Sequence, residues 1–443
     1  MQEVPFVVRS FLRHALTFVL TLGVCAALLL AVCAVIPQSA IQESCEEALL
    51  YFTENPGFPM VWDGHPGTRM DNYADCALLD VIYNADASRP LYSMVAAPYY
   101  RIEGNAIHLD FAAAVSEGKA PNNEYSRYWH GSQVLLRPLL TFTSIEGCRL
   151  AVFALLVMLN IVLSVLFIRR KLIRPLVIYW AGLLAVQAWV TAFTLEYVMT
   201  FLVMTGVCIG VVVFKPEYRS RLFLVSGVLT CFVDFLTAET LAFTIPALLC
   251  LMMSRERREN LSLKSLILWG VSWLAGYGLT FLIKWALVYI VLGGEALANA
   301  LTSAAYRIQR DVEVVGGDVA TVSSLSQLPL VLSRNLGCLL PFASDMSVGG
   351  MMAVVAGILA LAAALIYLFR GEKTDGKFIL YASLIGLLPY LRFAVMSSHS
   401  ADHYFFTFRA QMASVMALIA SLAYTLEPSY ILRGQKKRKR RRA

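Results

Sequence analysis

The sequence predicts an all-α protein that crosses a membrane about ten times. Of its 443 residues, 58% are hydrophobic and only 15% are charged, whereas soluble domains are about 45–50% apolar. The apolar residues form runs of about 20 residues, the length of a helix that spans a bilayer. Clusters of Lys and Arg separate the runs. Because such clusters mark cytoplasmic helix ends, the same pattern also orients the chain.

The first apolar run covers residues 15–36 and is preceded by Arg9 and Arg13. It is about 22 residues long, which is enough to span a bilayer. No convincing cleavage site stands before Pro37, so we interpret the run as a retained helix and not as a signal peptide. Its basic flank places the N-terminus in the cytoplasm.

The second run covers residues 148–168 and ends at Arg169 and Arg170. Since both basic flanks belong on the cytoplasmic side, the segment between the two runs is expected outside. Residues 38–147 therefore form a long first extracytoplasmic loop.

Eight further runs predict the remaining crossings. They cover residues 176–195, 198–214, 222–235, 239–253, 264–292, 347–369, 377–397 and 404–426. Two of these helices must be short, because only about 34 residues separate the basic residues Arg221 and Arg255. This spacing places Asp234 and Glu239 at a turn near the outer leaflet.

A second outer loop is expected at residues 293–346, and it carries Arg307 and Arg334. Ten crossings put both chain ends in the cytoplasm. The predicted transmembrane domain covers residues 1–426, and residues 427–443 form a basic cytoplasmic tail.

The net charge of +7 owes much to this tail. A basic run directly after a membrane helix faces anionic lipid, so membrane lipids are expected partners. No nucleic-acid recognition module accompanies the tail, and we therefore expect no nucleic-acid partner.

The nine cysteines lack metal-ligand spacing. Cys45 and Cys76 would face an oxidising compartment in this topology and form the first candidate for a disulfide. Free thiols at both positions agree equally well with the sequence.

Two carboxylates stand out in the first loop. If residues 71–80 form a helix, Asp71 and Asp75 lie one turn apart on one face. Such a pair can divide roles, one as a general base that activates a hydroxyl and the other holding an acceptor or a metal. The alternative is a solvated loop helix.

An aromatic and basic stretch ends the same loop. Tyr125, Arg127, Tyr128 and Trp129 precede the second crossing. Such residues commonly anchor a helix end at the interface. The alternative is a rim that stacks sugar rings and binds phosphate through the guanidinium group.

The last two crossings carry Arg392 and Arg409 within apolar runs, on either side of a turn that contains His399 and His403. An Arg inside a membrane segment is costly unless it meets a counter-charge or a water-filled cavity. We therefore expect either a structural ion pair with Asp234 or Glu239, or a cationic site for a lipid-linked phosphate.

Lys284 lies about 30 Å along the crossing at residues 264–292, near the outer interface. The spacing of His399 and His403 would permit a metal site together with Asp402. No further ligand is evident, so no metal or other cofactor is assigned. Binding of a divalent metal stays an open alternative.

Short basic inner loops, a long first outer loop and a polar turn between late helices resemble the GT-C superfamily of membrane glycosyltransferases. The resemblance implies transfer, with inversion, from a polyprenyl-phosphate-linked sugar to a glycan or protein acceptor in the envelope. It implies Asp71 as the base, with Asp75 as alternate. The leaving phosphate would be stabilised by cationic groups, namely Arg392, Arg409, Lys284 and His399 or His403.

The chain departs from the commonest pattern of that superfamily, because its first loop has no adjacent pair of acidic residues. The assignment of the base and the need for a metal therefore stay open. By analogy, the setting is a bacterial cytoplasmic membrane.

Two other functions fit the sequence. A transporter or flippase of a lipid-linked saccharide would place charges near the bilayer midplane, accessible from both sides. A non-catalytic envelope scaffold would tolerate carboxylate-to-amide changes in the first loop.

Overall fold

The structure is a computed structural model that describes residues 6–308, 310–313, 319–322, 324–343, 346–369 and 375–426. The predicted basic tail, residues 427–443, lies outside the described residues, as do Arg370 and Lys373. The described part is almost entirely helical, with two antiparallel pairs of short strands.

In the part of the chain that the structure describes, seven helical segments are long and apolar enough to cross a membrane. They are α1 (Phe6–Val35), α7 (Ile145–Arg169), α9 (Leu195–Val213), α12 (Leu263–Leu292), α15 (Val348–Phe369), α16 (Gly376–Val395) and the segment Tyr404–Thr425. The last segment comprises α18 (Tyr404–Thr407), the 3-10 helix η6 (Phe408–Gln411) and α19 (Met412–Thr425). The chain is thus a multi-pass membrane protein.

Three shorter helices lie at the other predicted crossings: α8 (Ile173–Ala185), α10 (Arg219–Val233) and α11 (Leu241–Glu256). The helix predicted over residues 176–195 is interrupted. Gln187 has a left-handed backbone conformation, with φ 53°. A single L-residue can adopt this conformation, but it cannot be part of a right-handed helix. The chain continues as the 3-10 helix η3 (Ala188–Phe193) before α9 begins.

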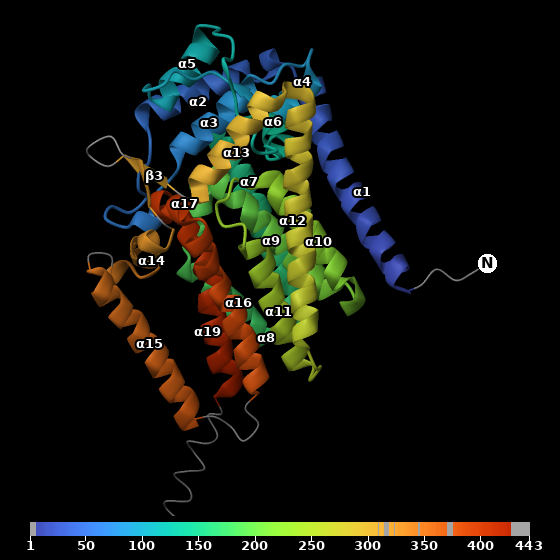
Figure 1. Cartoon of the computed structure of the whole chain (residues 1–443), viewed down its shortest axis with the longest axis vertical. Coiled ribbons are helices and arrows are strands. Elements are labelled where there is room, and N and C mark those ends of the chain that lie inside the picture. The colour runs from blue at the N-terminus through green and yellow to red at the C-terminus, as the bar shows by residue number, and fades with distance from the viewer. Residues whose placement is uncertain are drawn as a thin grey trace, which may run out of the picture.

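The long segment between α1 and α7, residues 36–144, forms a helical cap at one end of the bundle (Figure 1). Its helices are η1 (Gln38–Ala40), α2 (Gln42–Glu54), η2 (Pro66–Thr68), α3 (Asn72–Tyr83), α4 (Pro90–Ala96), α5 (Ile107–Ser116) and α6 (Gln133–Leu139), and its strands β1 (Pro98–Tyr99) and β2 (Asn123–Glu124). Phe52, Leu79 and Phe111 of the cap belong to one buried apolar cluster with α7. Cys45 and Cys76 are buried in this cluster as free thiols.

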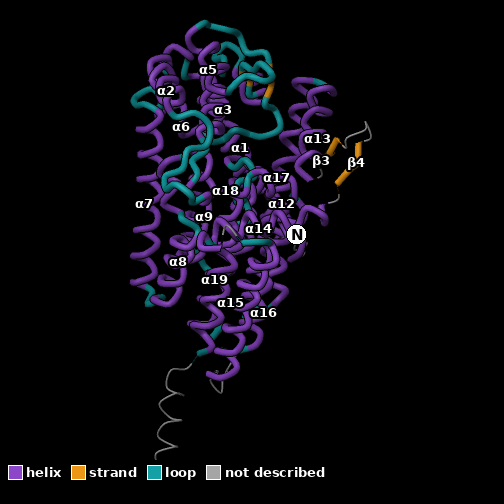
Figure 2. The backbone as a smooth tube through the Cα atoms, turned by 90° about the vertical axis from the view of Figure 1, so that its left-hand side faces the viewer, coloured by secondary structure: helices purple, strands orange, loops and turns teal. Residues whose placement is uncertain are grey.

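The second predicted loop contributes α13 (Gly294–Ile308), β3 (Arg310–Glu313), β4 (Val319–Val322), α14 (Ser324–Leu339) and η5 (Pro341–Ala343). Strands β3 and β4 lie at the side of the molecule beside α13 (Figure 2). Helix α14 packs against the short α17 (Ser397–Asp402), which joins α16 to the last membrane segment. Helices α13 and α17 both lie next to the cap, and both help to enclose the candidate site.

Helices α10 and α12 make the most extensive helix contact of the bundle. They approach closely because each has a glycine at the contact. A Cβ atom added to Gly227 would clash with the backbone carbonyl oxygen of Trp273, and one added to Gly276 would clash with that of Leu224. Small residues that allow such approach are typical of packed membrane helices, which gain little from hydrophobic contact alone.

Gly276→Ala is expected to lower the thermal stability of the purified protein, because the added methyl group must push α10 and α12 apart. Overpacking of this kind costs about 1–3 kcal/mol. Gly278→Ala is the matched control, since a Cβ atom there meets nothing within 4 Å. Equal melting temperatures for the two variants, measured in the same detergent, would contradict this account of the packing.

Candidate functional site

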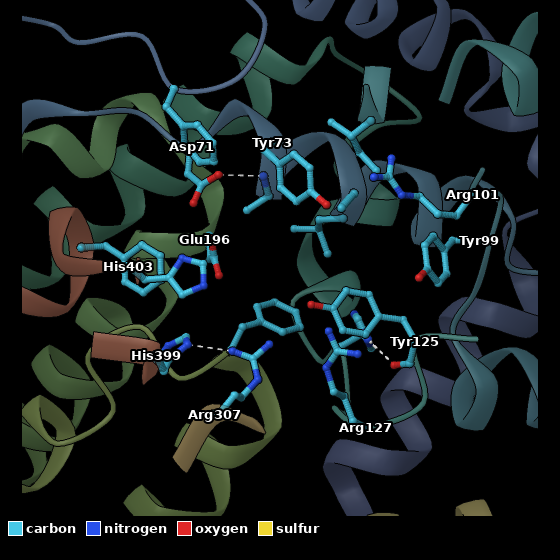
Figure 3. Close-up of a pocket in the computed structure, with 18 residues that line it drawn as sticks. Asp71, Tyr73, Tyr99, Arg101, Tyr125, Arg127, Glu196, Arg307, His399 and His403 are labelled. Atoms are coloured by element: carbon cyan, nitrogen blue, oxygen red, sulfur yellow. Dashed lines mark hydrogen bonds between the residues drawn. The ribbon is translucent and has the colours of Figure 1, made fainter. Parts of the chain in front are cut away.

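A cavity of about 390 Å³ lies between the cap and the ends of the membrane helices. It is lined by α3, the β1 region, the loop before α6, α9, α13 and α17 (Figure 3). Its polar lining consists of Asp71, Tyr73, Tyr99, Arg101, Tyr125, Arg127, His130, Glu196, Arg307, His399 and His403. The cavity therefore combines two carboxylates with arginine, histidine and tyrosine side chains from distant parts of the sequence.

Asp71 stands at the start of α3 and is only 3% exposed. Its carboxylate accepts a hydrogen bond from the backbone N–H of Ala74 at 2.8 Å, which caps the helix. Burial raises the pKa of Asp71 to about 7, and the Ala74 hydrogen bond limits the rise. A carboxyl group with a pKa near neutrality suits a general base, because it can both lose and accept a proton at working pH.

Glu196, in the first turn of α9, is the second carboxylate of the cavity. Figure 3 places it next to Asp71 and close to His403. Two carboxyl groups that lie this close repel each other when both are ionised. Its Oε2 atom is buried without a hydrogen-bond partner among the described residues. Asp71 and Glu196 thus form a pair of carboxyl groups that face the same cavity.

Asp75 does not line the cavity. It is fully buried and pairs with Arg149 of α7, Oδ2 to Nη2, at 2.7 Å. It also accepts hydrogen bonds from the backbone N–H groups of Leu195 (3.0 Å) and Glu196 (3.3 Å) at the start of α9. The predicted pair is thus divided: Asp71 faces the cavity, and Asp75 holds the end of α9 that presents Glu196.

Two arginines supply the free positive charge of the cavity. Arg127 lies 4.1 Å from the ring centroid of Tyr125, and Arg307 reaches in from α13. Neither has an ion pair with a described carboxylate, whereas Arg101 pairs with Asp110 at 2.6 Å. The sequence flagged Arg127 as part of an aromatic rim that could bind phosphate, and its position agrees with that alternative.

His399 holds Arg307 in place. Arg307 donates to Nδ1 of His399 at 2.7 Å, and His399 Nε2 lies 2.9 Å from the carbonyl oxygen of Leu236. Because guanidinium can only donate, Nδ1 must be the acceptor and Nε2 must carry the proton. Burial and the charge of Arg392 hold the pKa of His399 well below its usual range. His399 is thus a neutral residue that positions an arginine.

His403 also lines the cavity and stacks on Phe406 with the ring centroids 5.2 Å apart. Burial, together with the charges of Arg307 and Arg392, lowers the pKa of His403 to about 4. It is therefore neutral at pH 7 and can donate or accept a hydrogen bond.

Arg127 and Arg307 also line two neighbouring cavities. One, of about 430 Å³, is lined by polar residues and lies between α13 and α17. The other, of about 210 Å³, is largely apolar and lies between α12, α13 and the end of α16. Its apolar lining consists of Tyr128, Leu236, Phe281, Trp285, Ala300, Ala304, Val395 and Met396. The two arginines thus stand where a chamber with charged side chains meets an apolar groove.

The predicted intramembrane arginines are engaged elsewhere. Arg392 forms a buried ion pair with Glu239 at 2.9 Å, which is the structural alternative considered from the sequence. Arg409 donates to the carbonyl oxygens of Phe405 (2.9 Å) and Gly67 (3.0 Å) and so ties the last membrane segment to the cap. None of these side chains lines the cavity.

Lys284 and Asp234 are also structural. Lys284 donates to the carbonyl oxygens of Met94 (3.1 Å) and Val95 (2.8 Å) in the last turn of α4, where a cation is favoured by the helix dipole. Asp234 accepts from the Thr200 hydroxyl (2.5 Å) and the Leu236 N–H (2.9 Å). It closes the turn between α10 and α11.

Within the described ranges, no group of three or more His, Cys, Asp and Glu side chains is arranged to hold a metal ion. His399 has both ring nitrogens engaged, so it is not free to act as a ligand with Asp402 and His403 as the sequence allowed.

The chain matches no protein-family model, and no curated protein or solved structure is significantly similar to it. The functional assignment therefore depends on the geometry of the cavity.

Asp75→Asn is expected to lower the free energy of unfolding by about 3–5 kcal/mol, because it leaves the Arg149 guanidinium buried without a counter-charge. Thermal melts in detergent measure the loss. The double variant Asp75→Leu, Arg149→Met removes both charges and should recover part of the stability. Melting of Asp75→Asn at the wild-type temperature would show that the pair does not hold the cap to the bundle.

The raised pKa of Asp71 predicts a pH dependence of stability. The carboxyl titrates near 3.8 in the unfolded chain and near 7 in the folded protein. Between these pH values the folded protein retains a proton that the unfolded chain has released, so stability falls as pH rises toward 7. Asn at position 71 does not titrate but can still cap α3. We expect the melting temperature of Asp71→Asn, relative to wild type, to increase from pH 5 to pH 8. A constant difference would contradict the shifted pKa.

Proposed function

We propose that this protein transfers a sugar from a polyprenyl-phosphate donor to a hydroxyl of an envelope acceptor at the outer face of the membrane. The observation that carries the proposal is the junction at Arg127 and Arg307. On one side of it lies a chamber that contains charged side chains and a carboxylate of near-neutral pKa, and on the other an apolar groove. A molecule with a sugar, a phosphate and a hydrocarbon chain matches this order of environments.

In this proposal Asp71 is the general base. It accepts the proton of the acceptor hydroxyl while that oxygen forms a bond to the sugar carbon, and the bond from that carbon to the phosphate oxygen breaks. Attack from the face opposite the leaving group inverts the carbon. Glu196 lies beside Asp71, and its charge influences the pH at which the base is ionised.

The leaving phosphate takes the electron pair of the broken bond, and its negative charge is stabilised by Arg127 and Arg307. Guanidinium groups bind phosphate oxygens in pairs and keep their charge in a buried site. Preorganised donors aimed at developing charge are commonly the largest contribution to catalysis. His399 contributes by fixing the position of Arg307.

The proposed topology has ten crossings, with α8, α10 and α11 completing the seven longer segments. Both termini then lie in the cytoplasm, and the cap faces outward in a bacterial cytoplasmic membrane. The basic residues between the predicted crossings support this orientation. Under this orientation the candidate site opens at the outer face, where lipid-linked sugars serve as donors in the superfamily that the sequence resembles.

Two variants separate binding from chemistry. Asp71→Asn should retain bound polyprenyl phosphate but lose transfer by a factor of about 10²–10⁴, the usual contribution of a general base. The double variant Arg127→Ala, Arg307→Ala should lose the bound lipid itself. Native mass spectrometry of gently purified protein measures the lipid, and a lipid-linked sugar assay measures transfer.

Arg89→Ala serves as the control, because Arg89 is an exposed cap residue that lines none of the three cavities. Full transfer by Asp71→Asn would remove Asp71 from the role of base. Lipid binding with no transfer of any lipid-linked sugar by wild type would favour a transporter or flippase.

A further inference from the structure

A second large cavity, of about 630 Å³, lies at the opposite end of the bundle from the cap. It is enclosed where α8, α11, α16 and α19 have their ends, together with the loop that joins α11 to α12. Figure 1 shows these helix ends together at the pole farthest from α2 and α5. The cavity shares no lining residue with the three cavities around Arg127 and Arg307.

Each carboxylate of this cavity has an arginine within ion-pair distance. The pairs are Glu256–Arg174, Asp375–Arg255 and Glu259–Arg257, at 3.9, 3.6 and 4.0 Å. Glu256 also accepts a hydrogen bond from the Tyr424 hydroxyl at 2.9 Å. The three carboxylates at the cavity are therefore already neutralised by neighbouring arginines.

Two further cations line the cavity without such a match. Arg258 and Lys377 have no ion pair with any carboxylate of the described residues. Arg258 follows the end of α11 in a left-handed backbone conformation, φ 57°, and its N–H binds the carbonyl oxygen of Arg255 at 3.2 Å. The loop is thus held by its own backbone, while the two cationic side chains are left to bind an anion.

Aromatic side chains also line this cavity. Phe378 and Tyr381 are buried, and the rings of Phe378 and Tyr424 pack with their centroids 5.0 Å apart. The lining is nevertheless predominantly polar, as expected of a site for a lipid head group. Basic pockets between membrane helices commonly hold the head groups of anionic lipids.

We propose that this cavity binds the phosphate head group of an anionic phospholipid, with Arg258 and Lys377 as its cationic partners. A free phosphate ion offers the same chemistry to the two side chains. The position of the cavity at the ends of membrane helices favours the lipid. The proposal does not depend on the transferase activity, since no residue is shared between the two sites.

The test uses the full-length protein in detergent, titrated with phosphatidylglycerol, with phosphatidylcholine, or with inorganic phosphate, and followed by thermal stability and native mass spectrometry. Wild type should bind phosphatidylglycerol in preference to phosphatidylcholine. Arg258→Ala, Lys377→Ala should weaken the apparent affinity for phosphatidylglycerol about thirtyfold, since each basic residue near an anionic lipid surface contributes a factor of about five.

The matched control is Arg170→Ala, Lys264→Ala, which removes two exposed cations outside the cavity. This control should bind phosphatidylglycerol as wild type does. Equal weakening in both double variants, or equal binding of the two lipids by wild type, would overturn the proposal. Stabilisation by inorganic phosphate that Arg258→Ala, Lys377→Ala abolishes, without any lipid preference, would overturn the lipid as the ligand.

Discussion

The arrangement of the candidate site depends on one buried ion pair, between Asp75 and Arg149. Asp75 joins three elements: it belongs to α3, it pairs with α7, and it accepts the N–H groups that begin α9. A carboxylate at a helix N-terminus also compensates the helix dipole. Because Asp71 and Glu196 stand at the beginnings of α3 and α9, this single carboxylate determines how close the two cavity carboxylates lie.

The cationic half of the site is held in a similar way, through groups that do not themselves face a ligand. Arg392 is neutralised by Glu239 and donates to Ser400 at 2.7 Å, which fixes α17 beside α16. Helix α17 then presents His399 to Arg307 in a single tautomer. The membrane arginine that is most prominent in the sequence thus supports the site, and an arginine from the second loop, Arg307, reaches the cavity.

Hydropathy accounts for most of the fold, because most of the apolar runs form helices close to their predicted bounds. It could not reveal the interruption at Gln187, because the chain there adopts a left-handed backbone conformation without a Gly or Pro to signal it. Of the candidate site, Asp71, His399 and His403 were predictable from residue type and position. Glu196 was not, since its role depends on Asp75, which is 120 residues from the start of α9 in sequence. A charge that is costly in a membrane predicts a partner, but not whether the partner is protein or ligand.

The position of Arg127 and Arg307 at the junction of three cavities has a thermodynamic consequence. An anion in any one of these cavities takes up donors and positive charge that the other two would use. Binding of anions in the three cavities is therefore linked. An anion in one cavity lowers the affinity of a second cavity for its anion, and by reciprocity the second anion lowers the affinity for the first by the same factor. In the proposed transfer reaction, the polyprenyl phosphate would then have to leave Arg127 and Arg307 before the next donor binds.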